Sequence, residues 1–230
     1  MRQVIFDTET TGRSEKGAVC QDHRVIEIGC IELENRRPTG RHFHVYLNPE
    51  RPVDEEAFKV HGLSDTFLAK QPTFAQIADD FLVYLQSVDE LIAHNLPFDQ
   101  AFLNQEFKLI GNPTKLEKQF TLTDTLTLAR QQFPGQRNSL DALCKRFDID
   151  NSKRELHGAL LDAQLLAEVY LKLTGGQTDL SFNLQHTHHS NAHTAPLKPH
   201  NWRSATLNAQ EQQAHQTLLD SINPNKANSL

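Results

Sequence analysis

The feature that most constrains the fold is a change of periodicity along residues 1–182, from short apolar or β-branched runs to patterns typical of amphipathic helices. Runs bounded by turn residues predict strands at 3–7, 25–34, 42–47, 90–94 and around 120–123. The short, hairpin-like stretch 35–40 connects the second strand to the third, so this part of the sheet is expected to be antiparallel.

Helical patterns follow the first strands. Apolar side chains share one face of a predicted helix at 74–85, and Thr73 with Gln76 forms a capping box before it. Further helices are expected at 99–110, 125–132, 139–147 and 158–173, with Asp124 as the cap of the second of these. A hairpin followed by βαβ units implies a mixed sheet with helices on its faces, so the fold class is α/β.

Charge and composition exclude several classes of protein. A net charge of −6 argues against holding nucleic acid by a broad basic surface alone, although an enzyme could still grip phosphates through metal ions. No apolar run approaches the roughly 18 residues of a membrane span, and the start lacks the basic region of a secretory signal. The three cysteines are odd in number and widely spaced, which fits a reducing cytoplasm.

Composition changes near residue 182. We expect an α/β domain at 1–176, a flexible linker at 177–206 and a short docking segment at 207–230. The linker is rich in Asn, His, Thr and Ser with few large apolar side chains, so it cannot bury enough surface to offset its ordering entropy. Its histidines could bind a metal, although the simpler interpretation is that they are ordinary polar residues of a disordered linker.

Two acids, Asp7 and Glu9, close the first predicted strand. Side chains two residues apart in a strand point to the same face, so both carboxylates project from the strand's C-terminal end, where α/β sheets usually bind ligands. Like charges this close repel, and a cation between them relieves the repulsion. A polar strand end that enters a glycine turn is the alternative interpretation.

A third acid, Asp162, lies on the apolar face of its predicted helix. At about 100° per residue it groups with Leu166, Val169 and Leu173 rather than with the polar stripe. A carboxylate on such a face is costly unless it is paired or coordinates a metal. A buried Asp satisfied by an arginine or by a backbone cap is the alternative.

Asp99 and His157 give weaker signals. Asp99 shares a helical face with Phe102 and Leu103, but it also sits in a first turn, where Asp is favourable as a cap. His157 lies off the helical face of Asp162. If His157 belongs to the loop that leads into that helix, its imidazole can reach the same site and suits a general base, the role in which histidine is most often used.

Three motifs occur in order along the chain: DTETTG at 7–12, HNLPFD at 94–99 and HGALLD at 157–162. Together they resemble the motifs of the DEDDh (DnaQ-like) 3′→5′ exonucleases, and the stretch 137–144 resembles the proofreading branch that serves bacterial replicative DNA polymerases. The resemblance covers roughly residues 3–182. It implies a ribonuclease H-like fold and hydrolysis of 3′-terminal, mismatched nucleotides to dNMP.

By motif match, the resemblance implies a two-metal site. The residues implied to hold two Mg²⁺ or Mn²⁺ ions are Asp7, Glu9, Asp99 and Asp162, and His157 is implied to be the general base. Two ions about 3.5–4 Å apart would clamp the attacking and leaving oxygens and neutralise charge on the phosphate. An acidic protein could bind DNA in this way, because the carboxylates bind cations and the cations bind phosphate.

The same resemblance marks residues 56–63 as a loop over the terminal nucleotide. The side chains implied to bind this substrate are Asp7, Thr8, Glu9, Glu56, Val60, His61, Phe98 and Asp162. Among them, Val60 and Phe98 would pack against the base or sugar. From the residues alone, Glu56 would be a solvated helix residue and His61 a cation near a helix C-terminus.

The residues after the domain carry the partner predictions. Gln177, Leu180 and Phe182 are similar to the peptide that bacterial replication proteins insert into a sliding clamp, where apolar side chains fill a pocket. Segment 207–222, after a linker, is typical of a tethered docking helix. The resemblance implies that the polymerase α subunit is the dock and that a small θ-like accessory subunit binds the nuclease domain. An ordinary linker and a frayed terminus are the alternatives.

Three other functions stay open on the sequence. A haloacid dehalogenase-type phosphatase would use Asp7 and an acid two residues on, but it requires a second Asp rather than Glu9 and a downstream lysine motif that is not found. A DEDDh exoribonuclease that trims RNA 3′ ends would share every catalytic residue. A scaffold that kept the fold would bind partners without turnover.

Overall fold

The computed structural model describes residues 1–152, 154, 156–175 and 213. The chain divides into two units, Met1–Ser181 and Phe182–Leu230, and the sheet with its helices belongs to the first. The predicted clamp-binding peptide at 177–182, the linker and the docking segment lie outside the described residues, residue 213 excepted. None of the helices described is long and apolar enough to cross a membrane.

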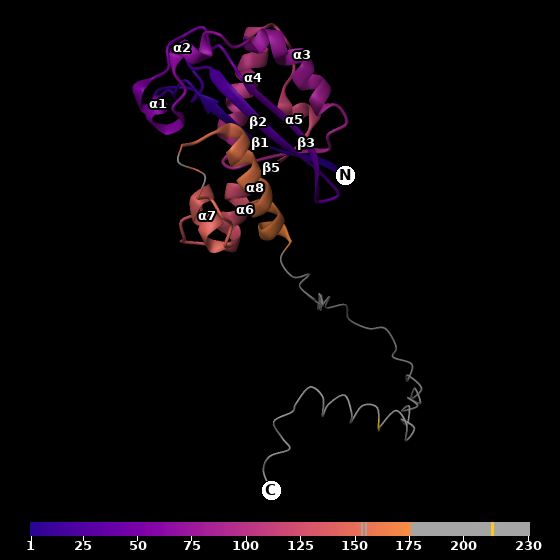
Figure 1. Ribbon diagram of the computed structural model, residues 1–230. Helices are drawn as coiled ribbons and strands as arrows, with labels where there is room; N and C mark the ends of the chain where they lie inside the picture. Colours follow the sequence, from indigo (N-terminus) through magenta and orange to yellow (C-terminus); the bar gives the residue numbers. More distant parts are fainter. Residues whose placement is uncertain (153, 155, 176–212, 214–230) are drawn as a thin grey trace, which may run out of the picture. The chain divides into compact units, whose positions relative to one another are not determined.

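Within the described residues, five strands form one mixed sheet in the order β3-β2-β1-β4-β5 (Figure 1). The strands are β1 (Arg2–Thr10), β2 (Val25–Glu34), β3 (Arg37–Tyr46), β4 (Glu90–Ala93) and β5 (Thr121–Asp124). β1 pairs antiparallel with β2, and β2 with β3, whereas β4 runs parallel to both β1 and β5. The predicted mixed sheet with an antiparallel start is confirmed.

The hairpin between β2 and β3 is tighter than expected. Asn35 and Arg36 alone make the turn, both with positive φ, and Glu34 already pairs with Arg37. A two-residue turn of this kind matches the twist of the flanking strands. Pro38 and Gly40 suggested a longer connection, but they lie within β3, which is an edge strand and tolerates them.

The helices described in this unit are α1 (Glu55–His61), α2 (Asp65–Leu68), α3 (Phe74–Leu85), α4 (Leu96–Leu109), α5 (Leu116–Gln119), α6 (Thr125–Gln132), α7 (Leu140–Arg146) and α8 (Ala159–Thr174). The capping box of Thr73 and Gln76 is present, and Asp124 caps α6 by accepting from the Leu126 N–H. Helix α4 begins three residues before its predicted start, because Pro97 suits a first turn.

Residues 56–63 are not the loop that was expected. Most of them form helix α1, which starts with Glu55 and Glu56 in its first turn and ends where Gly62 adopts the left-handed conformation at φ 71°. Acidic residues at a helix start and glycine just past its end are both favourable. The interpretation of Glu56 as a solvated helix residue is therefore right for its secondary structure.

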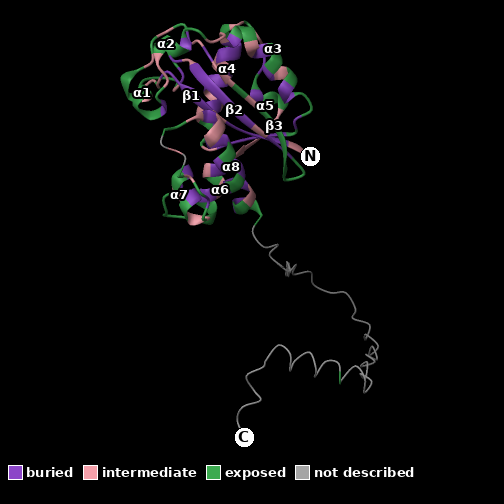
Figure 2. Cartoon of the chain, viewed as in Figure 1, coloured by how far each residue is buried: buried purple, intermediate pink, exposed green. Residues whose placement is uncertain are grey.

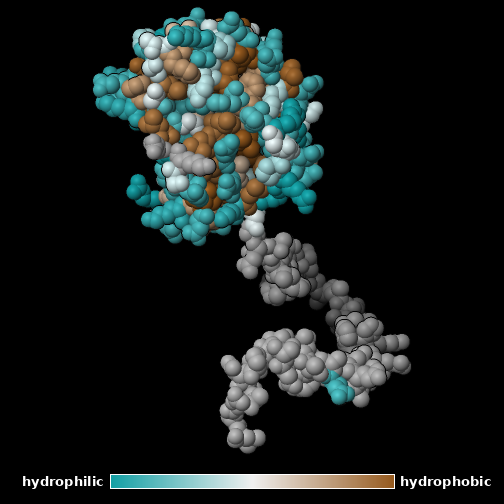
Figure 3. All heavy atoms as spheres, viewed as in Figure 1, coloured by the Kyte–Doolittle hydropathy of each residue, from teal (hydrophilic) through white to brown (hydrophobic). Residues whose placement is uncertain are grey.

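Side chains of β1 alternate between two hydrophobic cores, one on each face of the sheet. Val4 and Phe6 join a core that includes α3 and α4, whereas Ile5 joins a core with α7 and α8. Figure 2 shows β1 and β2 largely buried, with exposed residues along the outer sides of the helices. The face seen in Figure 3 is largely hydrophilic with apolar side chains gathered between the polar ones.

Gly29 lets helix α8 approach the sheet closely. It lies opposite Asp7 in the β1–β2 pairing, and a Cβ atom placed on it would lie 2.2 Å from the Leu160 nitrogen and 2.4 Å from the Ala159 oxygen. Since these are backbone atoms of the first turn of α8, no side-chain adjustment can relieve the clash. The small residue thus sets how near the start of α8 comes to the end of β1.

We expect Gly29→Ala to lower the free energy of unfolding by about 2–3 kcal/mol, because α8 must move away from β2. Urea unfolding followed by circular dichroism measures the change. Gly158→Ala is the matched control, since a Cβ atom there meets open space at an extended φ of −152°. An equal, small loss in both variants would contradict the close approach.

Candidate active site

A cleft of about 620 Å³ opens where β1 ends and α8 begins. The predicted catalytic and metal-binding residues all line it: Asp7, Glu9, Asp99, His157 and Asp162. They come from β1, α4 and the start of α8, so segments up to 155 positions apart in the chain supply one site. The structure brings every member of the predicted constellation together.

The acids of β1 and α4 are tied to one another through Thr8. Asp7 and Glu9 stand two positions apart within β1, a spacing that places two side chains on one face of a strand. Thr8 between them contacts Asp99 of α4. The backbone N–H of Thr8 donates to Asp99 Oδ1 at 3.0 Å, and its hydroxyl donates to the same oxygen at 2.7 Å. These two bonds fix the Asp99 carboxylate against the strand that carries the other acids.

Asp162 and His157 come from the entrance to α8. Asp162 is buried in the first turn, where its N–H donates to the Gly158 carbonyl at 2.9 Å. His157 precedes the N-cap Gly158, so it belongs to the loop that leads into the helix. This is the position that the sequence analysis required for His157 to reach the same site as Asp162. Its Nδ1 lies 3.3 Å from Asp162 Oδ2.

Arg154 also contacts the Asp162 carboxylate. Its Nε donates to Oδ1 at 2.5 Å and its Nη2 to Oδ2 at 2.7 Å. The sequence alternative of a buried Asp satisfied by an arginine is therefore realised within this cleft. Arg154 was not among the predicted site residues, because it lies in a loop and periodicity carries no signal there.

Burial and mutual repulsion raise the pKa values of three acids in the cleft. Burial, followed by the charge of Asp162, raises the pKa of Glu9 to about 8, and burial raises that of Asp99 to about 7. The pKa of Asp7 is raised well above its ordinary value by burial and then by the charge of Asp99. Burial would raise the pKa of Asp162, but the neighbouring His157 and the hydrogen-bonded Arg154 guanidinium outweigh it, so that this pKa is lowered.

These acids fit a divalent cation. Glu9, His157 and Asp162 each offer one ligand atom, and the three atoms lie within 4.8 Å of one another. Two of these atoms are carboxylate oxygens and the third is an imidazole nitrogen, and divalent cations bind both kinds of donor. A cation would also offset the repulsion that, after burial, raises the pKa values of Asp7 and Glu9. The donor set and the buried negative charge therefore agree with a metal site.

A second hollow of about 350 Å³ meets the cleft at Thr8, Glu9 and Phe98. The predicted substrate residues of α1 line it: Glu56, Val60 and His61. Glu56 and Val60 are exposed, whereas His61 is only 5% exposed. The two hollows thus lie on either side of the acids of β1, with Phe98 common to both.

His61 presents a buried hydrogen-bond donor. Its Nδ1 accepts from the Leu63 N–H at 3.0 Å, so the ring proton of the neutral imidazole is on Nε2. Nε2 is buried and has no hydrogen-bond partner among the described residues. Burial lowers the pKa of His61, which keeps the ring neutral near pH 7. An unpaired buried donor beside a hollow is a group that a ligand can satisfy.

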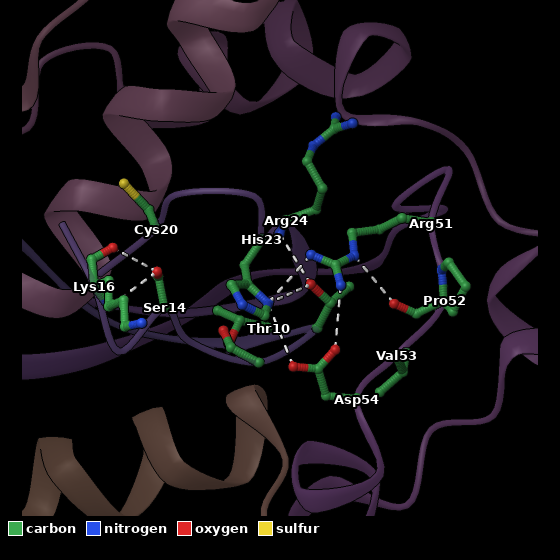
Figure 4. Close-up of polar contacts among 12 residues, drawn as sticks. Thr10, Ser14, Lys16, Cys20, His23, Arg24, Arg51, Pro52, Val53 and Asp54 are labelled. Carbon is green, nitrogen blue, oxygen red and sulfur yellow. Dashed lines mark hydrogen bonds and ion pairs between the residues drawn. The ribbon is translucent and has the colours of Figure 1, made fainter. Parts of the chain in front are cut away.

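A polar cluster fastens α1 to the end of β1 (Figure 4). The Asp54 N–H, just before α1, donates to the Thr11 carbonyl at 2.9 Å, and Arg51 donates to the Asp54 carboxylate at 3.1 Å. His23 Nδ1 lies 3.8 Å from the same carboxylate. A side chain at Gly12 would collide with both Asp54 and His23. The wall of the second hollow is therefore held to the strand that carries the acids.

The comparisons with known proteins identify the class of enzyme. The exonuclease family (RNase_T) matches residues 4–170. Two solved structures share the fold. Exonuclease X in complex with 5′-overhanging duplex DNA has a TM-score of 0.58 and 21% sequence identity, and the match covers 76% of this chain and 92% of that one. The nuclease domain of 3′hExo, a DEDDh family member bound to rAMP, has a TM-score of 0.60 and 16% identity, and the match covers 75% of this chain and 90% of that one. The fold and the matched family define a DEDDh exonuclease, a class that uses divalent metals.

Curated relatives narrow this class. The chain is 55% identical over 185 residues to DNA polymerase III subunit epsilon of Escherichia coli K12, which covers 80% of this chain and 76% of the relative. The epsilon subunit of Pasteurella multocida is 54% identical, and the match covers 78% of this chain and 70% of that relative. The epsilon subunit of Rickettsia typhi is also 54% identical, over 77% of this chain and 76% of that relative. The chain therefore belongs to the epsilon branch of the exonuclease family and is a 3′→5′ exonuclease.

The raised pKa of Glu9 predicts how stability depends on pH once EDTA has removed divalent cations. The folded protein binds a proton on the Glu9 carboxyl more tightly than the unfolded chain does, because the pKa of Glu9 rises from 4.5 to about 8 on folding. The stability that this proton contributes is therefore fully present below pH 4.5 and is lost as the pH rises toward 8. We expect Glu9→Gln to become more stable than the wild type at pH 8, by on the order of 2 kcal/mol.

Urea unfolding of both proteins at several pH values measures this difference. Subtraction cancels the histidines His23, His61 and His94, whose lowered pKa values affect both proteins alike. Added Mg²⁺ should stabilise the wild type more than Glu9→Gln. A difference between the two proteins that stays constant from pH 5 to about 8 would count against a strained carboxylate at this position.

Proposed function

We propose that this chain is the proofreading subunit of a bacterial DNA polymerase III, acts in the cytoplasm and removes mismatched 3′-terminal nucleotides from DNA as dNMP. The convergence of four acids and a histidine on one cleft is the observation that carries the proposal. The names of the relatives at 52–55% identity support the polymerase and its DNA substrate. The same names do not favour the alternative of an RNA-trimming exonuclease.

Asp7, Glu9, Asp99 and Asp162 would hold two divalent cations, Mg²⁺ or Mn²⁺. When bound, such cations supply Lewis-acid activation of the attacking water and neutralise charge on the phosphate. The protein's own contribution is to keep the carboxylates in place: β1 orients the first two, the Thr8 bonds hold Asp99, and the first turn of α8 holds Asp162.

His157 would accept the proton of the attacking water. Its side chain is 45% exposed at the cleft, so water reaches it, and Nδ1 is the ring nitrogen that faces Asp162. The backbone N–H of His157 donates to the Val60 carbonyl at 3.1 Å, which ties the base to the helix beside the substrate pocket. A base held by its own backbone in this way is positioned before substrate binds.

The second hollow would receive the terminal nucleotide. Val60 and Phe98 would pack against its base or sugar, and His61 Nε2 would donate to it. Glu56, on the rim, would accept from a hydroxyl of the nucleotide. The scissile bond would then lie at Thr8 and Glu9, where the hollow meets the cleft, and the rest of the strand would continue through the cleft.

Partners are proposed from the sequence and from the relatives' names. The DNA polymerase III α subunit would bind residues 207–230, the sliding clamp would bind Gln177, Leu180 and Phe182, and a θ-like accessory subunit would bind the nuclease domain. In this arrangement residues 183–206 act as a tether, which keeps the exonuclease at a high effective concentration beside the primer end.

The proposal predicts that Asp7→Ala abolishes shortening of a 5′-labelled primer–template with a 3′-terminal mismatch, because two cations can no longer be held. Wild-type protein should give a ladder that shrinks from the 3′ end in Mg²⁺ and releases dNMP, and EDTA should stop it. Asp79→Ala, an exposed acid of α3 outside the cleft, is the control and should keep activity within roughly twofold.

An RNA oligonucleotide of the same sequence separates the alternatives. Trimming of RNA with an intact DNA primer would place the protein among RNA-processing exonucleases and reject the proposal. Wild-type protein that degrades neither substrate, but still binds the polymerase α subunit, would support a scaffold instead.

For the clamp, we expect Leu180→Ala with Phe182→Ala to weaken binding by at least about tenfold, because both apolar side chains that fill the pocket are removed. Surface plasmon resonance on immobilised clamp measures the affinity of the full chain. Ser181→Ala between them is the control. Unchanged affinity of the double variant would leave 177–182 as the start of an ordinary linker.

A further inference from the structure

Arg154 makes more contacts than an ion pair with Asp162 requires. Its Nη1 donates to Asp141 Oδ1 of α7 at 2.6 Å, and its Nη2 donates to His157 Nδ1 at 2.9 Å as well as to Asp162. Its side chain is only 7% exposed. One guanidinium thus joins α7, the proposed base and a proposed metal ligand, and none of the roles described so far accounts for the contact with His157.

The contact with Arg154 determines where the imidazole carries its proton. A guanidinium has five N–H donors and no acceptor, and it stays charged in proteins. Nδ1 of His157 must therefore accept, so the proton of the neutral ring is on Nε2. The lone pair of Nδ1 then points toward Arg154 and Asp162, on the side of the ring that faces the carboxylates.

Without Arg154, the neighbouring carboxylate would favour the opposite tautomer. Asp162 Oδ2 lies 3.3 Å from Nδ1, close enough to accept a hydrogen bond from a protonated Nδ1. Asp162 would then draw the proton onto the nitrogen that faces the site, and the free lone pair would lie on Nε2, on the far side of the ring. A base in that tautomer cannot take a proton at Nδ1.

We propose that Arg154 is a positioning residue for the exonuclease reaction: it holds His157 in the tautomer whose Nδ1 carries no proton and can act as the acceptor, and it orients Asp162 at the same time. A water molecule that donates to Nδ1 would replace the Arg154 N–H there. The inference rests on the proposed function, in which His157 is the general base.

Asp141 explains how Arg154 can act on both residues at once. It anchors Nη1 from α7, so the guanidinium plane is fixed and Nε and Nη2 remain for Asp162 and His157. A planar fork of this kind holds several acceptors in a fixed geometry, which an ammonium group cannot do. Within the described chain, Arg154 is also the only Lys or Arg in an ion pair with one of the four proposed metal ligands.

The test compares full-length wild type with Arg154→Met, Arg154→Lys and Arg36→Met. Arg36 is the matched control, because it bonds to Thr174 and the Leu171 carbonyl at the opposite end of α8. Nitrogen-15 NMR of histidine-labelled protein, freed of metal ions and at a pH where the ring is neutral, reports which nitrogen of His157 is protonated. This readout does not depend on activity.

We expect a proton on Nε2 in the wild type and in Arg36→Met, and on Nδ1 in Arg154→Met. In primer degradation with Mg²⁺, kcat of Arg154→Met should fall by about ten- to a hundredfold while KM changes by less than roughly twofold, because the base is affected and substrate contacts are not. Arg154→Lys keeps one donor and should recover part of both properties. It also provides the comparison if the methionine variant does not fold.

A protonated Nδ1 in the wild type, or the same tautomer in the wild type and Arg154→Met, would overturn the inference, as would an unchanged kcat. Failure of the proposed function looks different: the wild type itself would not shorten the DNA primer, whatever the NMR spectra show.

Discussion

Repulsion among the carboxylates at the end of β1 is the interaction on which the rest of the site depends. Burial and the neighbouring charges raise the pKa values of Asp7 and Glu9, so the folded chain keeps these acids together at a cost. Positive charge from bound cations or from a cationic side chain can offset that cost while the acids stay ionised. Arg154 supplies such a charge next to Asp162, and the proposed chemistry uses the remaining negative charge to recruit metal ions.

The fold supplies the rigidity that this arrangement needs. β1 is buried between two hydrophobic cores, so its acids cannot move apart to relieve their repulsion. Gly29 brings the first turn of α8 against β2, and Thr8 ties Asp99 to the strand. Apolar burial on both faces of the sheet therefore offsets the strain at its end, as is usual where function requires unfavourable local contacts.

The substrate side of the site is coupled to the base through backbone contacts. The His157 N–H bonds to the Val60 carbonyl, and Leu156 packs where a side chain on Gly62 would lie. The helix that lines the second hollow and the loop that carries the proposed base are thus held to each other. If the second hollow binds a nucleotide as proposed, α1 and His157 are already fixed relative to each other before it binds.

The sequence by itself determined the elements whose signals are local. Alternation in β1 and the capping box at Thr73 follow from patterns within a few residues, so the mixed α/β fold could be predicted. The resemblance of the three acidic motifs to a known family added the expectation that five residues share a site, and all five line one cleft. Only the tertiary structure decided that His61 Nε2 is buried with no hydrogen-bond partner among the described residues, and that Arg154 bonds to Asp141, His157 and Asp162 together. These features depend on contacts between separate elements, and no periodicity within one segment can encode them.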